Sequence, residues 1–186
     1  MNFKHIGKTN ISRYLKYTDT SKGVWERRCS ARDEWNKPHR TVYEQNLHRH
    51  YNENNSVYYT LDIPRNEIEP TLLKEADLNT CSFKANIISS YPGNMEGMHI
   101  DLYGSFLGRN KSLADIEDKI YTIKRVWIPL QDSVMGQLFF TPDNTLQSWR
   151  AGDMFEVPNK VFHGFANVSD RQRFTLLLTG YRRTFE

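Results

Sequence analysis

Short apolar segments separated by turn residues dominate the second half of the chain. From residue 82 onward these segments are rich in β-branched and aromatic residues and are bounded by Gly, Pro, Asn or Asp, a pattern typical of β-strands. Their close spacing, with no helical pattern between most of them, favours antiparallel sheets in a sandwich or barrel. We therefore predict a mainly β, eight-stranded jelly roll. Its expected strands are 82–91, 97–103, 121–131, 136–141, 145–149, 153–157, 161–167 and 172–180.

The first eighty residues follow a different pattern. The first 55 are polar and lack a sustained period, which predicts loops and one short helix packed on the β domain. Residues 57–61 are β-branched and aromatic and predict a strand. Residues 69–78 predict a helix, with Pro70 near its start and an apolar stripe that includes Leu72 and Leu73. We expect one domain over 1–186, with a helical and irregular N-terminal extension (1–80) on a β core (82–183).

Composition excludes several classes of protein. The chain has 186 residues and a formal net charge of +3, too small to suggest a nucleic-acid partner. No apolar run approaches the roughly 20 residues that a membrane-spanning helix needs. The first residues, MNFKHIGKTN, lack the apolar region of a secretory signal, so we expect a cytoplasmic protein. Cys29 and Cys81 are too few for a disulfide framework and are expected to be ordinary thiols.

Three residues of the predicted β domain form a candidate metal site. His99 and Asp101 are two positions apart, so on a strand over 97–103 their side chains would point to the same face. His163 lies on another predicted strand. Two imidazoles and one carboxylate can occupy one face of an octahedral metal ion and leave three positions open, as in non-haem Fe(II) oxygenases.

With these residues in this order, the C-terminal part of the chain resembles the Fe(II)/2-oxoglutarate-dependent dioxygenases. The fold of that family is a double-stranded β-helix of eight strands. An H-x-D pair and a distal His hold the iron, and an Arg about ten residues after the distal His binds 2-oxoglutarate. Arg173-Phe174-Thr175 stands at that place in this sequence.

The resemblance implies a role for each of these residues. His99, Asp101 and His163 would bind Fe(II). The keto-acid end of 2-oxoglutarate would take two of the open positions, and O₂ the third. Arg173 would hold the distal carboxylate, because a guanidinium offers two parallel donors to it. Thr175 lies two residues along the same strand and would add a hydroxyl on the same side.

Other positions are expected to support this site. Tyr91-Pro92-Gly93 resembles the Tyr-x-x-Gly lead-in of prolyl-hydroxylase-like members, with the spacing different by one residue. We therefore expect Tyr91 and Asn86 as further contacts of the cosubstrate, with core packing as the alternative for Tyr91. The long connection 104–120 is predicted to be a functional loop or lid.

Several remaining residues are expected to be structural. Trp127 and Phe139 are predicted to belong to the core. Arg125 is a rival carboxylate binder for which we expect surface exposure. The pair His48 and His50 is expected to lie in a solvated loop.

The sequence leaves three functions open. The first is an Fe(II)/2-oxoglutarate-dependent hydroxylase acting on an amino-acid, peptide or small-metabolite substrate, with release of succinate and CO₂. The second is a cupin-like metalloprotein that does not use 2-oxoglutarate. The third is a non-catalytic binding module whose basic N-terminal region, which includes Trp25 and Trp35, recruits an acidic partner. For those two tryptophans the alternative is packing on the main domain.

Overall fold

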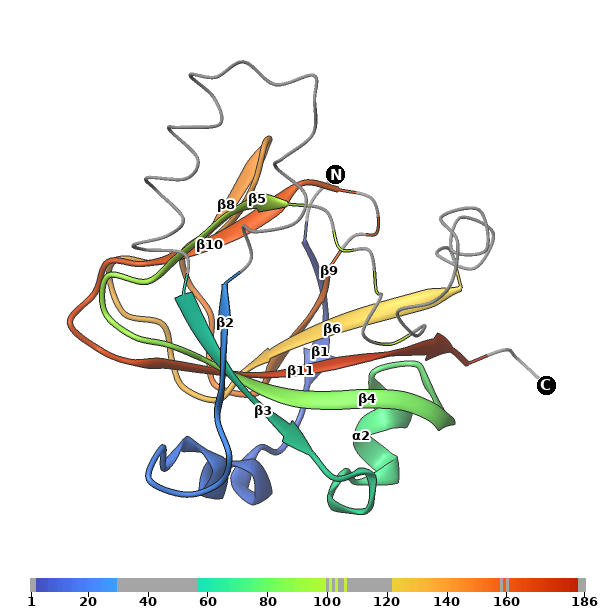
Figure 1. The fold of residues 1–186 in the computed structure, drawn as a ribbon. Coiled ribbons are helices and arrows are strands. Elements are labelled where there is room, and N and C mark those ends of the chain that lie inside the picture. The colour runs from blue at the N-terminus through green and yellow to red at the C-terminus, as the bar shows by residue number, and fades with distance from the viewer. Residues whose placement is uncertain are drawn as a thin grey trace, which may run out of the picture.

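Two antiparallel sheets form the protein in the computed structural model (Figure 1). The structure describes residues 3–29, 57–99, 122–157 and 161–183, together with Asp101, Tyr103, Phe106 and Asn159. The larger sheet has the strand order β1-β9-β6-β11-β4-β3-β2 and the smaller sheet β5-β10-β7-β8. The strands are β1 (Lys4–Lys8), β2 (Glu26–Cys29), β3 (Val57–Ile63), β4 (Leu78–Ser90), β5 (Met95–His99), β6 (Ile123–Pro129), β7 (Gln137–Thr141), β8 (Asn144–Leu146), β9 (Asp153–Val157), β10 (His163–Asn167) and β11 (Arg173–Arg182). The predicted mainly β jelly roll is confirmed.

The large sheet is covered on both faces. The 3₁₀-helix η1 (Ser12–Thr18) and helix α2 (Pro70–Glu75) lie on its outer face, below the sheet in Figure 1. The inner face packs against the small sheet through an aromatic core that contains Trp127, Phe139 and Phe165. Consequently the central strand β11 is buried on both sides over Arg173–Gly180, including its polar residues Arg173, Thr175 and Thr179.

Trp127 and Phe139 are core residues, as predicted, with exposed fractions of 3% and 5%. Their rings stack with centroids 5.2 Å apart, one from each sheet. Trp25 is partly buried and packs edge-on against Phe174 on the outer face. Packing on the main domain is therefore confirmed for Trp25, whereas Trp35 lies outside the described residues.

The N-terminal part contributes more β-structure than its sequence predicts. β1 pairs with β9 at one edge of the large sheet, and β2 pairs with β3 at the other. Within the described residues 3–29, η1 agrees with the expected short helix, whereas β1 and β2 stand where loops were predicted. These two strands lie at the sheet edges, where a strand has only one partner.

Several element boundaries also differ from the prediction, and the strand expected at 145–149 is observed at Asn144–Leu146. Helix α2 ends at Glu75 and β4 begins at Leu78, because Asp77 between them adopts a left-handed conformation with φ of 56° that a helix cannot contain. β5 ends at His99, so the expected strand over 97–103 is wrong in its second half.

Some predictions fall outside the described residues. These are the solvated-loop histidines His48 and His50 and nearly all of the expected lid over 104–120. Cys81 is a free, exposed thiol, as expected. No helix in the described part of the chain is long and apolar enough to span a bilayer.

Candidate metal centre

Two neighbouring strands of the small sheet bring the two histidines together. His99 is the last residue of β5 and His163 the first of β10, and the two are direct partners in the antiparallel register. Their ring centroids are 4.5 Å apart. β10 lies tightly against its neighbours, because a Cβ on Gly164 would come within 2.6 Å of the Glu96 carbonyl oxygen. This packing fixes the backbone that carries His163.

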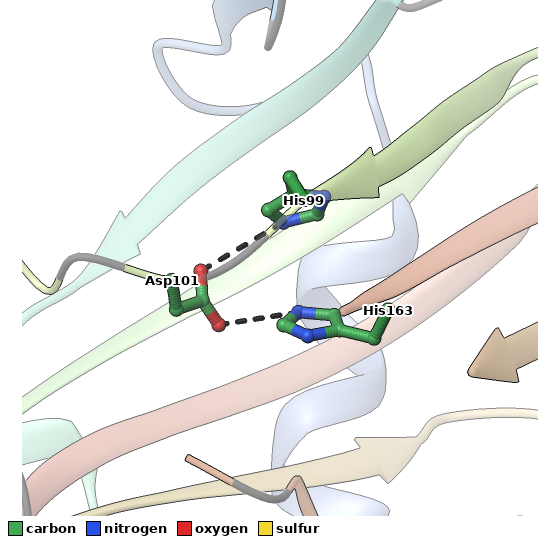
Figure 2. A group of neighbouring side chains, drawn as sticks. All are labelled: His99, Asp101 and His163. Atoms are coloured by element: carbon green, nitrogen blue, oxygen red, sulfur yellow. Dashed lines mark ion pairs between the residues drawn. The ribbon is translucent and has the colours of Figure 1, made fainter. Parts of the chain in front are cut away.

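Asp101 completes the group from the segment that follows β5 (Figure 2). Its Oδ1 lies 3.8 Å from His99 Nε2, and its Oδ2 lies 3.3 Å from His163 Nε2. Donor atoms of all three side chains lie within 4.8 Å of one another. The three residues predicted as metal ligands therefore converge, although Asp101 reaches the site from beyond the strand end rather than by the alternation of a strand.

Backbone carbonyls orient both imidazole rings. The Nδ1 of His99 donates to the Gly97 carbonyl oxygen at 3.0 Å, and the Nδ1 of His163 donates to the Val161 carbonyl oxygen at 2.9 Å. A carbonyl oxygen can only accept, so the proton is on Nδ1 in each neutral ring and the lone pair is on Nε2. Both Nε2 atoms face Asp101, an arrangement in which protein imidazoles bind metal ions.

Arg125 holds the Asp101 carboxylate, and this corrects the expectation that Arg125 is exposed. Its side chain is 14% exposed, and its Nη1 forms an ion pair with Asp101 Oδ2. Its Nε donates to Thr179 Oγ1 at 3.2 Å, and its Cζ lies 4.9 Å from the centre of the Tyr103 ring. Burial alone would raise the pKa of Asp101, but Arg125, with help from His163, holds it well below its usual range.

A second carboxylate lies beside the histidines. Two residues of β10, His163 and Phe165, oppose His99 and Glu96 of β5, so β5 has one extra residue between its paired positions. This bulge places Glu96 Oε1 3.6 Å from His99 Nε2, although residues three apart on a regular strand face opposite sides. Glu96 is 8% exposed, and burial raises its pKa.

The metal-site residues line a cavity of about 440 Å³, and Arg173 also lines it. Arg173 is 2% exposed, and its Nη1 donates to the Leu138 carbonyl oxygen at 3.3 Å. Its Cζ lies 4.5 Å from the centre of the Phe165 ring. No carboxylate of the described residues lies within ion-pairing distance of it. Burial lowers the pKa of Arg173 to about 10, a shift that the charge of Glu96 opposes.

Two buried hydroxyls without hydrogen-bond partners flank Arg173. Thr175 lies two residues along β11 and is 1% exposed, and Ser90 on β4 is the direct register partner of Arg173 and is fully buried. Both Oγ atoms lack a partner among the described residues. Directly paired residues share a face of the sheet, so both hydroxyls are on the same face as Arg173, although neither is among the described residues that line the cavity.

The two remaining predicted contacts differ in position. Asn86 lines the cavity from β4. Tyr91 is 38% exposed, packs edge-on against Tyr59 and is not among the described residues that line the cavity. The structure therefore brings Asn86 to the site and leaves Tyr91 at the surface, just beyond the end of β4.

Sequence reasoning expected Arg125 at the surface and did not name Glu96 or Ser90. The burial of Arg125 had no signal in the sequence, because the alternation of a strand does not reveal which face another layer covers. Glu96 had none either, because its position depends on the bulge.

No protein-family model matches the sequence, and no curated protein matches it. Among solved structures, the chain is similar to the cupin domain of Cnp3 from Schizosaccharomyces pombe, at 10% identity and a TM-score of 0.41, over 67% of this chain and 64% of that one. It is similar to a sugar phosphate isomerase from a cupin superfamily of Silicibacter pomeroyi, at 14% identity and a TM-score of 0.41, over 72% of this chain and 64% of that one. It is also similar to a predicted oxalate decarboxylase from Thermotoga maritima, at 10% identity and a TM-score of 0.40, over 67% of this chain and 81% of that one. The chain thus spans less than two thirds of the first two, and its fold assignment rests on strand order.

Proposed function

We propose that the protein is an Fe(II)- and 2-oxoglutarate-dependent oxygenase that hydroxylates a C–H bond of an amino-acid, peptide or small-metabolite substrate. Arg173 carries this proposal. It is a buried guanidinium with no carboxylate of the described residues within ion-pairing distance, in the same cavity as a group of two histidines and one aspartate. Burying an unpaired charge costs several kcal/mol, so its presence calls for an anionic ligand.

The donor set fits Fe(II). His99, Asp101 and His163 would hold the ion through two imidazole nitrogens and one carboxylate oxygen, the set typical of non-haem iron sites with open positions. When bound, iron with 2-oxoglutarate supplies the activation of O₂ and the hydroxylation of the substrate, with release of succinate and CO₂.

The surroundings of Arg173 fit a carboxylate. Arg173 would donate two N–H groups to the distal carboxylate of 2-oxoglutarate, and the free hydroxyls of Thr175 and Ser90 would donate to the same oxygens. The aromatic rings around Arg173 keep water away and strengthen these bonds.

The charges that line the cavity balance. Its described lining residues include three cations and three anions: Lys84, Arg125, Arg173, Asp62, Glu96 and Asp101. A divalent metal ion and a dianion such as 2-oxoglutarate would together leave the net charge in the cavity unchanged. We expect each to raise the affinity of the other.

An anaerobic titration of the metal-free protein with Fe(II), followed by 2-oxoglutarate, tests the proposal. We expect the weak visible charge-transfer band of an iron-chelated keto acid. His99→Ala should abolish the band, and Arg173→Met should shift its appearance to at least tenfold higher 2-oxoglutarate. Arg150→Met is the matched control, because Arg150 is exposed and pairs with Asp132 outside the cavity.

The other outcomes identify the alternatives. Iron binding without the band, unaffected by Arg173→Met, would favour a cupin-like metalloprotein that does not use 2-oxoglutarate. A protein that binds no metal ion would contradict both enzymatic functions and leave a non-catalytic binding module.

A further inference from the structure

Glu96 is a buried carboxylate for which the proposed function has no role. It is 8% exposed, it lines the cavity, and within the described part of the chain its carboxylate accepts no hydrogen bond. Its Oε1 lies 3.6 Å from His99 Nε2. This nitrogen is the one that the Gly97 carbonyl leaves free to bind a metal ion.

The backbone that carries Glu96 is held in place, so its side chain alone can move. The bulge between Glu96 and His99 gives both side chains the same face of β5. The close contact of Gly164 with the Glu96 carbonyl oxygen keeps this part of β5 against β10. Rotation about the side-chain bonds of Glu96 is then sufficient to move its carboxylate toward or away from the histidines.

The two carboxylates beside His99 are not equivalent. Arg125 forms an ion pair with Asp101, whereas no cation of the described residues is within ion-pairing distance of Glu96 except His99 itself, if protonated. A buried carboxylate without a counter-charge is costly, and a divalent cation between the histidines would remove that cost.

The distance to His99 is also suitable for a shared ion. Nitrogen and oxygen ligands lie at about 2.0–2.2 Å from a metal ion such as Zn²⁺. Two ligand atoms of one octahedral ion are then separated by about 3 Å when adjacent and about 4.2 Å when opposite. The 3.6 Å between Glu96 Oε1 and His99 Nε2 falls between these values. Glu96 is not in the group whose donor atoms all lie within 4.8 Å of one another, and opposite ligands of one ion are only about 4.2 Å apart, so the Glu96 side chain has to rotate before it can bind the same ion as the other three residues.

We propose that Glu96 is a fourth, displaceable ligand of the metal ion. It binds the ion while no cosubstrate is present, and it leaves when 2-oxoglutarate chelates the ion. Displacement rests on the proposed function, because a permanent fourth ligand would leave two positions where 2-oxoglutarate and O₂ together need three. Metal binding by Glu96 does not depend on that function.

The test uses Mn(II) as the probe and requires no turnover. The free Mn(II) signal in electron paramagnetic resonance measures the affinity of the full-length protein for the metal ion, first alone and then with increasing 2-oxoglutarate. The variants are Glu96→Gln and Glu96→Met. Glu156→Gln is the control, because Glu156 is a partly buried carboxylate whose ion pairs with Arg182 and Lys124 lie outside the cavity.

We expect effects of opposite sign. Loss of Glu96 should weaken Mn(II) binding about tenfold or more, and it should strengthen 2-oxoglutarate binding to the metal-loaded protein by a similar factor, because nothing has to be displaced. Glu156→Gln should change neither. Thermal unfolding of each variant verifies that it is folded. If Glu96→Met does not fold, the more conservative Glu96→Gln provides the test.

Two results would overturn the proposal. Unchanged Mn(II) affinity in both Glu96 variants would show that Glu96 is not a ligand. Weaker binding of both Mn(II) and 2-oxoglutarate would exclude displacement. If the unaltered protein binds Mn(II) but not 2-oxoglutarate, the proposed function fails, and the Mn(II) measurements alone still decide whether Glu96 is a ligand.

Discussion

The cavity contains two buried arginines whose surroundings are opposite. Arg125 on β6 has a carboxylate partner, Asp101, and a hydroxyl partner, Thr179. Arg173 on the adjacent strand β11 has one carbonyl and two aromatic rings. Burial lowers the pKa of both, but for Arg125 the nearby Asp101 reverses the shift and the net change is upward, whereas the pKa of Arg173 falls to about 10.

This difference indicates a structural role for the charge of Arg125 and a ligand-binding role for the charge of Arg173. The free energy of a buried guanidinium depends on whether the protein itself supplies the counter-charge. For Arg125 it does, and the ion pair also orients a predicted metal ligand. For Arg173 no described carboxylate is within ion-pairing distance and only the more distant charge of Glu96 acts on it, which is why we propose a bound anion as its counter-charge.

The largest expected effect is on stability and distinguishes the two arginines directly. Arg125→Met should lower the free energy of unfolding by about 3 kcal/mol, because it leaves Asp101 buried without its partner. Arg173→Met should leave it unchanged or raise it slightly, because an unpaired buried charge is replaced by an apolar side chain of similar length. Urea denaturation of the metal-free proteins measures both.

Asp132→Ala is the control for this pair. It breaks an ion pair between exposed side chains and should cost less than about 1 kcal/mol. Equal destabilisation by Arg125→Met and Arg173→Met would contradict the assignment of different roles.

The next effect concerns the ligand. Arg173→Met should weaken 2-oxoglutarate binding to the metal-loaded protein about 100-fold, or about 2.7 kcal/mol, because the charged hydrogen bonds to the distal carboxylate are lost. Arg173→Lys should recover part of this, since it restores the charge but not the paired donors. Isothermal titration calorimetry with Mn(II) in place of iron is the measurement. A loss below threefold in Arg173→Met would refute the assignment.

A smaller effect is expected at the two unpartnered hydroxyls. Thr175→Val and Ser90→Ala should each weaken 2-oxoglutarate binding about fivefold, close to 1 kcal/mol for one hydrogen bond. Neither should lower stability, because neither hydroxyl has a hydrogen-bond partner in the described part of the chain. The same calorimetric titration measures the affinity, and urea denaturation measures the stability. A loss of stability without a loss of affinity would assign both hydroxyls a role in the fold only.

The smallest effect is expected at Tyr91. Its hydroxyl lies at the surface beside Tyr59, away from the cavity, so Tyr91→Phe should change 2-oxoglutarate affinity by less than twofold. A larger change in the calorimetric titration would restore the role that its place before the H-x-D pair suggests.

The local sequence pattern was sufficient to predict the bounds of a strand where these depend only on the strand itself and its flanking turns. The strand 153–157 begins and ends where the alternation of apolar and polar residues predicts, and β11 differs from its prediction by one residue at its start and two at its end. The order and spacing of His99, Asp101, His163 and Arg173 were likewise readable, because strands of a jelly roll return to the same cavity in a regular succession.

Only the tertiary structure decided which polar side chains face one another. Arg125 lies on a strand, and a strand alternates between two faces without revealing which face is covered by another layer. Its burial depends on the small sheet and its partner on the segment after β5, both distant in sequence. Glu96 reaches His99 only through a bulge that changes the register by one residue, and the pairing with β10 sets that register. The residues of the site were therefore determined by the sequence, whereas the pairing of their charges was decided by contacts between strands.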